Sequence, residues 1–115
     1  MLLVEDEPAV RRSLQLILQG NGFDVHSYAS GAALLADPNA RRASAIVADY
    51  RLPETDGFTI LRALKAAGFA GRAILITAYH STELAAEASA AGYDKVLEKP
   101  LAERLLSEAV AGLGA

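Results

Sequence analysis

The sequence predicts a three-layer α/β sandwich, in which helices cover both faces of a doubly wound parallel β-sheet. Short apolar runs alternate along the chain with segments that have the spacing of amphipathic helices. Two of these runs, Ala45–Ala48 and Ala73–Ile76, are almost continuously apolar, as expected for central strands buried on both sides. With 115 residues, 52% of them hydrophobic, the chain suits one self-supporting domain spanning residues 1–115.

Five strands are expected, because five short apolar runs are separated by turn residues and helical segments. Crossover connections between parallel strands are almost always right-handed, so few topologies remain open and doubly wound orders lead among them. The strands are expected at Leu2–Val4, Val25–Tyr28, Ala45–Ala48, Ala73–Thr77 and Lys95–Leu97.

Five helices are expected between and after these strands. Pro8 suits the first turn of the first helix, and Gly20 with Asn21 marks its end. Gly68 and Gly92 end the third and fourth helices in the same way. The helices are expected at Pro8–Gln19, Ser30 to about Ala36, Phe58–Ala67, Thr82–Ala91 and Leu101–Leu113.

Composition excludes several classes of function. A net charge of -3 provides no electrostatic reason for this domain to bind nucleic acid or an acidic membrane. The chain has no cysteine, which excludes disulfides and thiolate metal sites and fits a cytoplasmic location. No apolar stretch approaches the ~20 residues of a membrane span, and no signal peptide is visible. Because Met1 lies almost inside the first apolar run, we expect a few native residues upstream.

Polar residues gather at the ends of the predicted strands. Glu5 and Asp6 follow the first strand, Asp49 follows the third, Thr77 ends the fourth and Lys99 lies just beyond the fifth. Ligands of open α/β sheets bind beyond the carboxyl ends of the strands. Three carboxylates, a hydroxyl and an amine are therefore expected to converge at one edge.

Clustered carboxylates need a cation. Two unit charges 4 Å apart repel by about 4 kcal/mol at an effective dielectric of 20. A site with oxygen ligands alone favours a hard divalent ion, and Mg²⁺ suits phosphate chemistry. A carboxylate beside Mg²⁺ can act as a nucleophile toward a phosphoryl group, whose oxygens Lys99 and Thr77 could hold.

Each of these residues also has a simpler explanation. The acids before Pro8 could favour a helix N-terminus, Asp49 could begin a turn, and Lys99 could be a solvated loop residue. The joint placement of the residues carries the prediction, since all the simple explanations would have to hold together. No stacking motif is visible around the tyrosines Tyr28, Tyr50, Tyr79 and Tyr93.

Four motifs resemble the response-regulator receiver domain of two-component signalling. "LLVEDEP" resembles its acidic pair, "DYRLPETDG" its phosphoacceptor motif, "ILITAY" its Thr/Ser-Ala motif, and "LEKP" its Lys-Pro motif. They occur in order with suitable spacing, and the resemblance covers essentially the whole chain. It implies a flavodoxin-like sandwich with strand order 2-1-3-4-5, and a receiver domain over residues 1–115.

The resemblance also implies the roles of the site residues. Asp49 would accept a phosphoryl group from the phosphohistidine of a histidine kinase or phosphotransfer protein. Asp6 and Asp49 would bind Mg²⁺ directly, together with the backbone carbonyl of Arg51. Glu5 replaces the aspartate common at the first acidic position, so its contribution to the metal site would run through water.

Thr77 and Lys99 would contact the phosphoryl oxygens, according to the same resemblance. The Lys99–Pro100 peptide bond is expected to be cis, a form that only about 5–6% of X-Pro bonds adopt. Receivers commonly carry Phe or Tyr three residues before the lysine, as a rotamer switch. Val96 stands there in this chain, so the aromatic rotamer switch of the family is absent at this position.

The favoured interpretation is a phosphorylation-switched signalling module, not an enzyme, whose output surface is the fourth helix, fifth strand and fifth helix. Its output partner is unspecified, and a phosphorylation-linked homodimer is among the expected assemblies. One alternative is a pseudo-receiver that works without phosphorylation. Another is a phosphatase of the haloacid-dehalogenase type, but those enzymes carry Asp-x-Asp after their first strand, whereas Asp49 follows the third and Arg51 stands two residues on.

Overall fold

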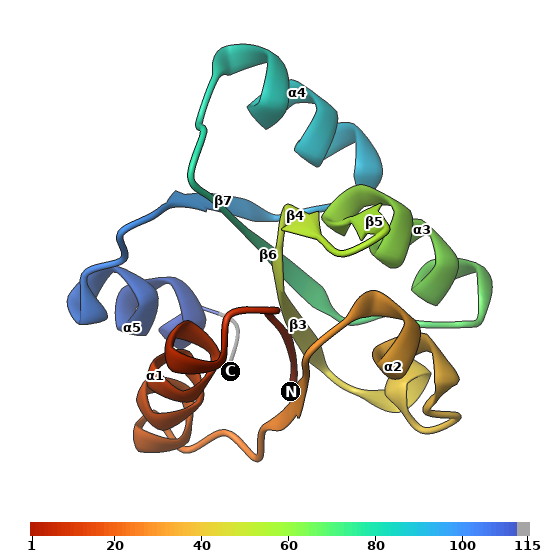
Figure 1. Cartoon of the computed structure of the whole chain (residues 1–115), viewed down its shortest axis with the longest axis horizontal. Helices are drawn as coiled ribbons and strands as arrows, with labels where there is room; N and C mark the ends of the chain where they lie inside the picture. The colour runs from red at the N-terminus through yellow and green to blue at the C-terminus, as the bar shows by residue number, and fades with distance from the viewer. Residues whose placement is uncertain (113–115) are drawn as a thin grey trace.

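A five-stranded parallel sheet lies between two layers of helices in the computed structural model, which describes residues 1–112 (Figure 1). The strand order is β2-β1-β3-β6-β7, and every neighbouring pair is parallel. Counting only the strands of this sheet, the order is 2-1-3-4-5, which confirms the predicted fold class. The strands are β1 (Leu2–Val4), β2 (His26–Tyr28), β3 (Ala45–Asp49), β6 (Arg72–Thr77) and β7 (Lys95–Glu98).

Five α-helices connect and follow the strands: α1 (Pro8–Gly20), α2 (Gly31–Ala36), α3 (Gly57–Ala66), α4 (Thr82–Ala91) and α5 (Glu103–Ala111). The prediction for α4 is correct at both ends. The predicted start of α5 is two residues too early, because Ala102 has an extended backbone with ψ 136°. Its predicted end, Leu113, lies outside the described residues. Within residues 1–112, no helix is both long and apolar enough to span a bilayer.

The sequence prediction omitted three short elements. One is the 3-10 turn η1 (Ala40–Arg42), and the others are the strands β4 (Arg51–Leu52) and β5 (Thr55–Asp56), which pair as a small antiparallel hairpin. The hairpin turn places Glu54 at φ 64°, a conformation that non-glycine residues adopt uncommonly. None of these three elements contains an apolar run, so the hydrophobic pattern does not indicate them.

The core is divided by the sheet into two layers. Successive side chains of a strand point to opposite faces, so Ile46 and Ala48 pack with α2, α3 and α4, whereas Val47 packs with α1 and α5. Figure 1 shows the same division, with α1 and α5 together on one side of the sheet. The strands β1, β3 and β6 are covered on both faces and have apolar interiors, so their polar residues are confined to the strand ends.

Candidate functional site

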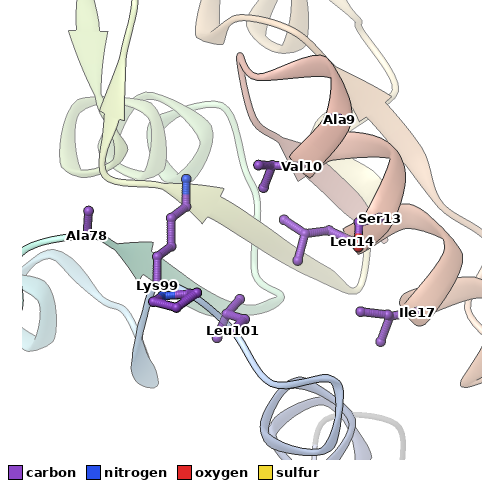
Figure 2. Close-up of a pocket in the computed structure, with 9 residues that line it drawn as sticks. Ala9, Val10, Ser13, Leu14, Ile17, Ala78, Lys99 and Leu101 are labelled. Carbon is purple, nitrogen blue, oxygen red and sulfur yellow. The ribbon is translucent and has the colours of Figure 1, made fainter.

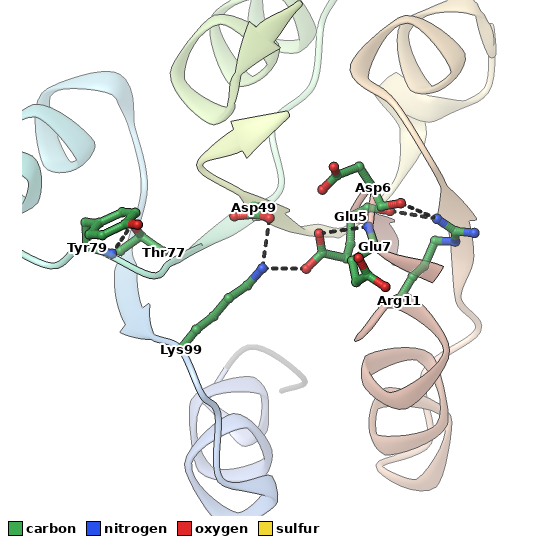
Figure 3. A network of polar contacts seen from close by, with 8 residues as sticks. All are labelled: Glu5, Asp6, Glu7, Arg11, Asp49, Thr77, Tyr79 and Lys99. Atoms are coloured by element: carbon green, nitrogen blue, oxygen red, sulfur yellow. Dashed lines mark hydrogen bonds and ion pairs between the residues drawn. The ribbon is translucent and has the colours of Figure 1, made fainter. Parts of the chain in front are cut away.

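Three carboxylates meet at the carboxyl edge of the sheet (Figure 3). β1 and β3 are neighbours with Val4 opposite Ala48, so the residues that follow, Glu5 and Asp49, come side by side. With Asp6, each offers an oxygen within 4.8 Å of the others. Glu5 is only 1% exposed and Asp49 7%, whereas Asp6 is open to solvent. The structure thus brings together the three acids that the sequence singled out.

Lys99 lies between two of these carboxylates. Its Nζ donates hydrogen bonds to Glu5 Oε1 at 2.6 Å and to Asp49 Oδ2 at 2.9 Å. The Lys99–Pro100 bond is cis, as expected. One ammonium group faces three carboxylates, so the cluster keeps a surplus of negative charge unless a proton or a cation is added.

Burial and charge shift the protonation of this cluster. Burial raises the pKa of the Glu5 carboxyl to about 7; the bond from Lys99 opposes this shift and the Asp49 carboxylate reinforces it. For Lys99, burial lowers the pKa, but the bonds to Glu5 and Asp49 outweigh it and leave the pKa raised. Near neutral pH the site therefore keeps a charged lysine beside a glutamate that is close to its titration point.

The oxygen donors fit a small divalent cation. Mg²⁺ binds oxygen at 2.0–2.1 Å, so two ligands on opposite sides of the ion lie about 4.2 Å apart. The oxygens of Glu5, Asp6 and Asp49 all lie within 4.8 Å of one another, so small side-chain adjustments suffice. Asp6 is exposed and leaves the site accessible from solvent. The third expected ligand, the Arg51 carbonyl, remains a prediction.

Thr77 ends β6 directly beside the acidic cluster. Ile76, the residue before it, is the register partner of Asp49. The Thr77 side chain is buried, and its Oγ1 accepts a hydrogen bond from the backbone N–H of Tyr79 at 3.1 Å. The predicted contact of Thr77 with a phosphoryl oxygen remains a prediction, but the hydroxyl is already tied to the loop that follows.

The Asp56-Gly57 pair anchors the chain segment that follows Asp49. Asp56 caps α3, since its Oδ1 accepts a hydrogen bond from the Thr59 N–H at 2.8 Å. Gly57 donates its N–H to the Tyr50 carbonyl, and a Cβ at Gly57 would lie 3.0 Å from the Asp49 carbonyl oxygen. A side chain at this position would crowd the Asp49 carbonyl, so the glycine allows α3 to begin close to the backbone of Asp49.

An apolar cavity of about 540 Å³ borders the site between α1 and the loop after β7 (Figure 2). Lys99 is part of both the cavity and the acidic cluster, because its aliphatic stem lines the cavity and its Nζ bonds to the carboxylates of Glu5 and Asp49. The cavity is lined by Ala9, Val10, Ser13, Leu14, Ile17, Ala78, Lys99, Pro100 and Leu101.

Sequence reasoning missed Arg11, whose Nη1 donates to the backbone carbonyls of Glu5 and Asp6 (Figure 3). The position of Arg11 in the sequence could have indicated this contact, because an arginine in the first turn of a helix can reach back to the loop that precedes it. The sequence shows no stacking motif around the tyrosines, yet two of them make ring contacts in the fold. Tyr50 packs on Phe58 with ring centroids 5.0 Å apart, and Phe58 contacts Tyr93 at 6.3 Å. The rings are tilted by 52° and 56°, and no local sequence motif indicates either contact.

Comparison with known proteins connects this geometry to a family. The sequence pattern of the response regulator receiver domain matches residues 1–111. The transcriptional regulatory protein FixJ of Rhizobium meliloti is 35% identical over 94% of this chain and 53% of its own length. The response regulator MprA of Mycobacterium avium is 34% identical over 93% of this chain and 47% of its own length. This chain thus spans about half the length of these relatives.

Solved structures show the same fold. A CheY-like receiver domain protein from Methanospirillum hungatei has a TM-score of 0.86 at 27% identity, covering 96% of this chain and 89% of that one. The receiver domain of the Francisella response regulator 1452 has a TM-score of 0.87 at 27% identity, covering 97% and 93%.

Proposed function

The chain belongs to the response regulator receiver domain family, and from that membership we propose that it acts as a phosphoacceptor switch. In this proposal Asp49 receives a phosphoryl group from a histidine kinase or phosphotransfer protein. The observation that supports it most is the bridge from Lys99 to both Asp49 and Glu5 within a cluster of three carboxylates. The domain would comprise residues 1–115 and act in signalling, not as an enzyme.

Asp49 would act as the nucleophile. Lys99 bonds only to its Oδ2, and within residues 1–112 no hydrogen bond is made to Oδ1. A bond would form between an Asp49 oxygen and phosphorus while the phosphorus–nitrogen bond of the donor breaks, leaving the electron pair on the imidazole. Lys99 would turn its ammonium toward a phosphoryl oxygen, and the Thr77 hydroxyl would donate to another.

Glu5, Asp6, Asp49 and the carbonyl of Arg51 are the groups that would hold Mg²⁺ in this proposal. When bound, the ion would neutralise negative charge on the phosphoryl oxygens. The chain itself would supply these oxygens at the carboxyl edge of the sheet and place the cluster beside the apolar core.

The phosphodonor would contact the surface nearest to Asp49. The apolar cavity between α1 and the loop after β7 is continuous with the site through Lys99, so we assign it to an apolar surface of the donor. The output surface would be α4, β7 and α5, acting in the cytoplasm on a partner or effector domain, with a phosphorylation-linked homodimer as one outcome. Because FixJ is named a transcriptional regulatory protein, a transcriptional output is proposed here, without nucleic-acid contact by this domain itself.

Intact-mass spectrometry after incubation with a small phosphodonor and Mg²⁺ tests this function. The parent should gain one phosphoryl group, and Asp49→Asn should gain none. Asp24→Asn is the matched control, because Asp24 is an exposed aspartate far from the cluster in the sequence, and it should be labelled like the parent. Equal labelling of Asp49→Asn, or no labelling of the parent with several donors, would reject the assignment.

A further inference from the structure

Arg11 connects the first turn of α1 to the loop that carries the acidic pair. Its Nη1 donates to the carbonyl oxygen of Glu5 at 2.9 Å and to that of Asp6 at 3.4 Å (Figure 3). The backbone of Arg11 is also fixed, because its N–H donates a hydrogen bond to the Glu7 carbonyl at 2.8 Å. The side chain is half-buried, so its position is restricted by packing as well as by hydrogen bonds.

Asp6 has few contacts that fix the position of its carboxylate. It is the exposed member of the carboxylate cluster, and within residues 1–112 its carboxylate accepts no hydrogen bond. Glu5, in contrast, is buried, is bonded by Lys99, and lies within 3.4 Å of the Glu7 N–H through Oε2. The direction of the Asp6 carboxylate therefore depends on the backbone of its own loop, and Arg11 is the side chain that binds that backbone.

We propose that Arg11 is a positioning residue for the magnesium site, which fixes the loop carbonyls of Glu5 and Asp6 and so keeps the Asp6 carboxylate directed at Asp49. The inference rests on the proposed function, since it assumes that the cluster binds Mg²⁺. Arg11 would not touch the ion. It would raise the affinity by removing the need to order the loop when the metal binds.

The sign of the effect separates positioning from simple electrostatics. Arg11 carries a positive charge, which repels a cation nearby, so removal of the charge alone would tighten Mg²⁺ binding. Loss of the two carbonyl bonds would weaken it. Arg12 provides the matched control, because it is the next residue of the same helix, is exposed, and makes no hydrogen bond through its side chain within residues 1–112.

The experiment compares the Mg²⁺ dissociation constants of the parent, Arg11→Met and Arg12→Met, measured by isothermal titration calorimetry on the unphosphorylated proteins. Arg11→Met should weaken binding by about tenfold or more, the lower end of what the loss of a group supporting metal ligands costs. Arg12→Met should leave it unchanged or slightly tighter. Arg11→Lys keeps the charge and one donor in reach, and should restore part of the affinity. Equal affinities for Arg11→Met and Arg12→Met would overturn the proposal.

Two further comparisons separate failure of the proposed metal site, or misfolding of a variant, from failure of the inference about Arg11. Asp6→Ala should abolish the parent's Mg²⁺ binding; undiminished binding there would reject the proposed metal site and this inference together, whereas failure of Arg11→Met alone rejects only the inference. Should Arg11→Met not fold, Arg11→Lys against Arg12→Lys carries the comparison. Weaker binding by Arg11→Lys then supports positioning, and equal binding contradicts it.

Discussion

The Arg51 guanidinium lies over the face of the Tyr79 ring, with 5.0 Å between Cζ and the ring centroid. Tyr79 is 68% exposed, so the contact is made at the surface. It joins the segment after β3 to the loop after β6, the two segments that flank Asp49 at the sheet edge. A cation–π contact at an exposed site is worth about 0.5–1 kcal/mol, enough to favour this arrangement without locking it.

We expect the phosphorylated form of this protein to lose its phosphoryl group slowly. Hydrolysis needs an in-line water, and the stacked pair of Arg51 and Tyr79 flanks its approach without offering a carboxylate or amide to orient it. The double variant Arg51→Asn with Tyr79→Glu should decay faster than the parent, by about tenfold or more. The decay is followed by intact-mass spectrometry after removal of the phosphodonor.

Tyr79→Phe is the control for that measurement, because it keeps the aromatic ring on which Arg51 packs. Its decay should match that of the parent. Faster decay in the parent than in the double variant would contradict the role assigned to the pair.

The signal is expected to leave the site through the loop after β6. Val96, at the usual aromatic position, is half-buried and lines a cavity of about 290 Å³; because it is β-branched, its χ1 is stiff and it does not swing as an aromatic side chain would. The Tyr79 N–H, however, donates directly to the Thr77 hydroxyl. If Thr77 turns toward a phosphoryl oxygen, this bond must change, and the loop leading to Ser81 and α4 shifts with it.

Structures with and without beryllofluoride, a phosphoryl mimic, would show this. Tyr79 should take a new position while Val96 keeps its rotamer. A rotated Val96 with a static Tyr79 loop would disprove the route. No response at all would favour the pseudo-receiver alternative.

Magnesium should stabilise the fold. The ion would relieve repulsion among Glu5, Asp6 and Asp49, and a ligand at 100 times its dissociation constant adds about 2.7 kcal/mol to the free energy of unfolding. For a domain of this size that raises Tm by on the order of 10 °C. Thermal melts with and without Mg²⁺ measure the shift. An undiminished shift in Asp6→Ala would place the ion elsewhere.

The stability of the metal-free protein should fall between pH 5 and pH 8. The pKa of Glu5 is raised from 4.5 to about 7, so the folded state keeps a proton that the unfolded chain releases. The resulting stabilisation is complete below pH 4.5 and is lost as the pH rises through 7. A shift of this size corresponds to about 3 kcal/mol in the free energy of unfolding.

Urea titrations at several pH values measure this dependence. Glu5→Gln should flatten the fall, because an amide does not titrate, whereas Glu87→Gln on the exposed face of α4 should not. The same group should make the Mg²⁺-induced Tm shift grow with pH over this range. A parent and a Glu5→Gln variant with the same pH dependence would refute the role of Glu5.

The sequence alone determined the fold and the membership of the acidic cluster. Apolar runs and helix-ending glycines are local features of the sequence, so β1 and α4 could be placed residue for residue. Parallel strands present their carboxyl ends at a shared edge, so Glu5, Asp49 and Lys99 had to meet once the strand order was known. The fold class needs only the chain's own pattern and the rules of topology, whereas the strand order came from the resemblance to the receiver family.

Only the tertiary structure decided how these residues contact one another. Glu5 and Asp6 are adjacent in sequence, yet one is buried and the other exposed. Lys99 bonds to Glu5 across 94 positions of the chain, and Arg51 packs on Tyr79 from a different loop. Such contacts depend on side-chain rotamers and on the spacing between elements far apart in sequence. A local sequence pattern specifies neither, because each side chain adopts its final rotamer only when the elements around it have packed.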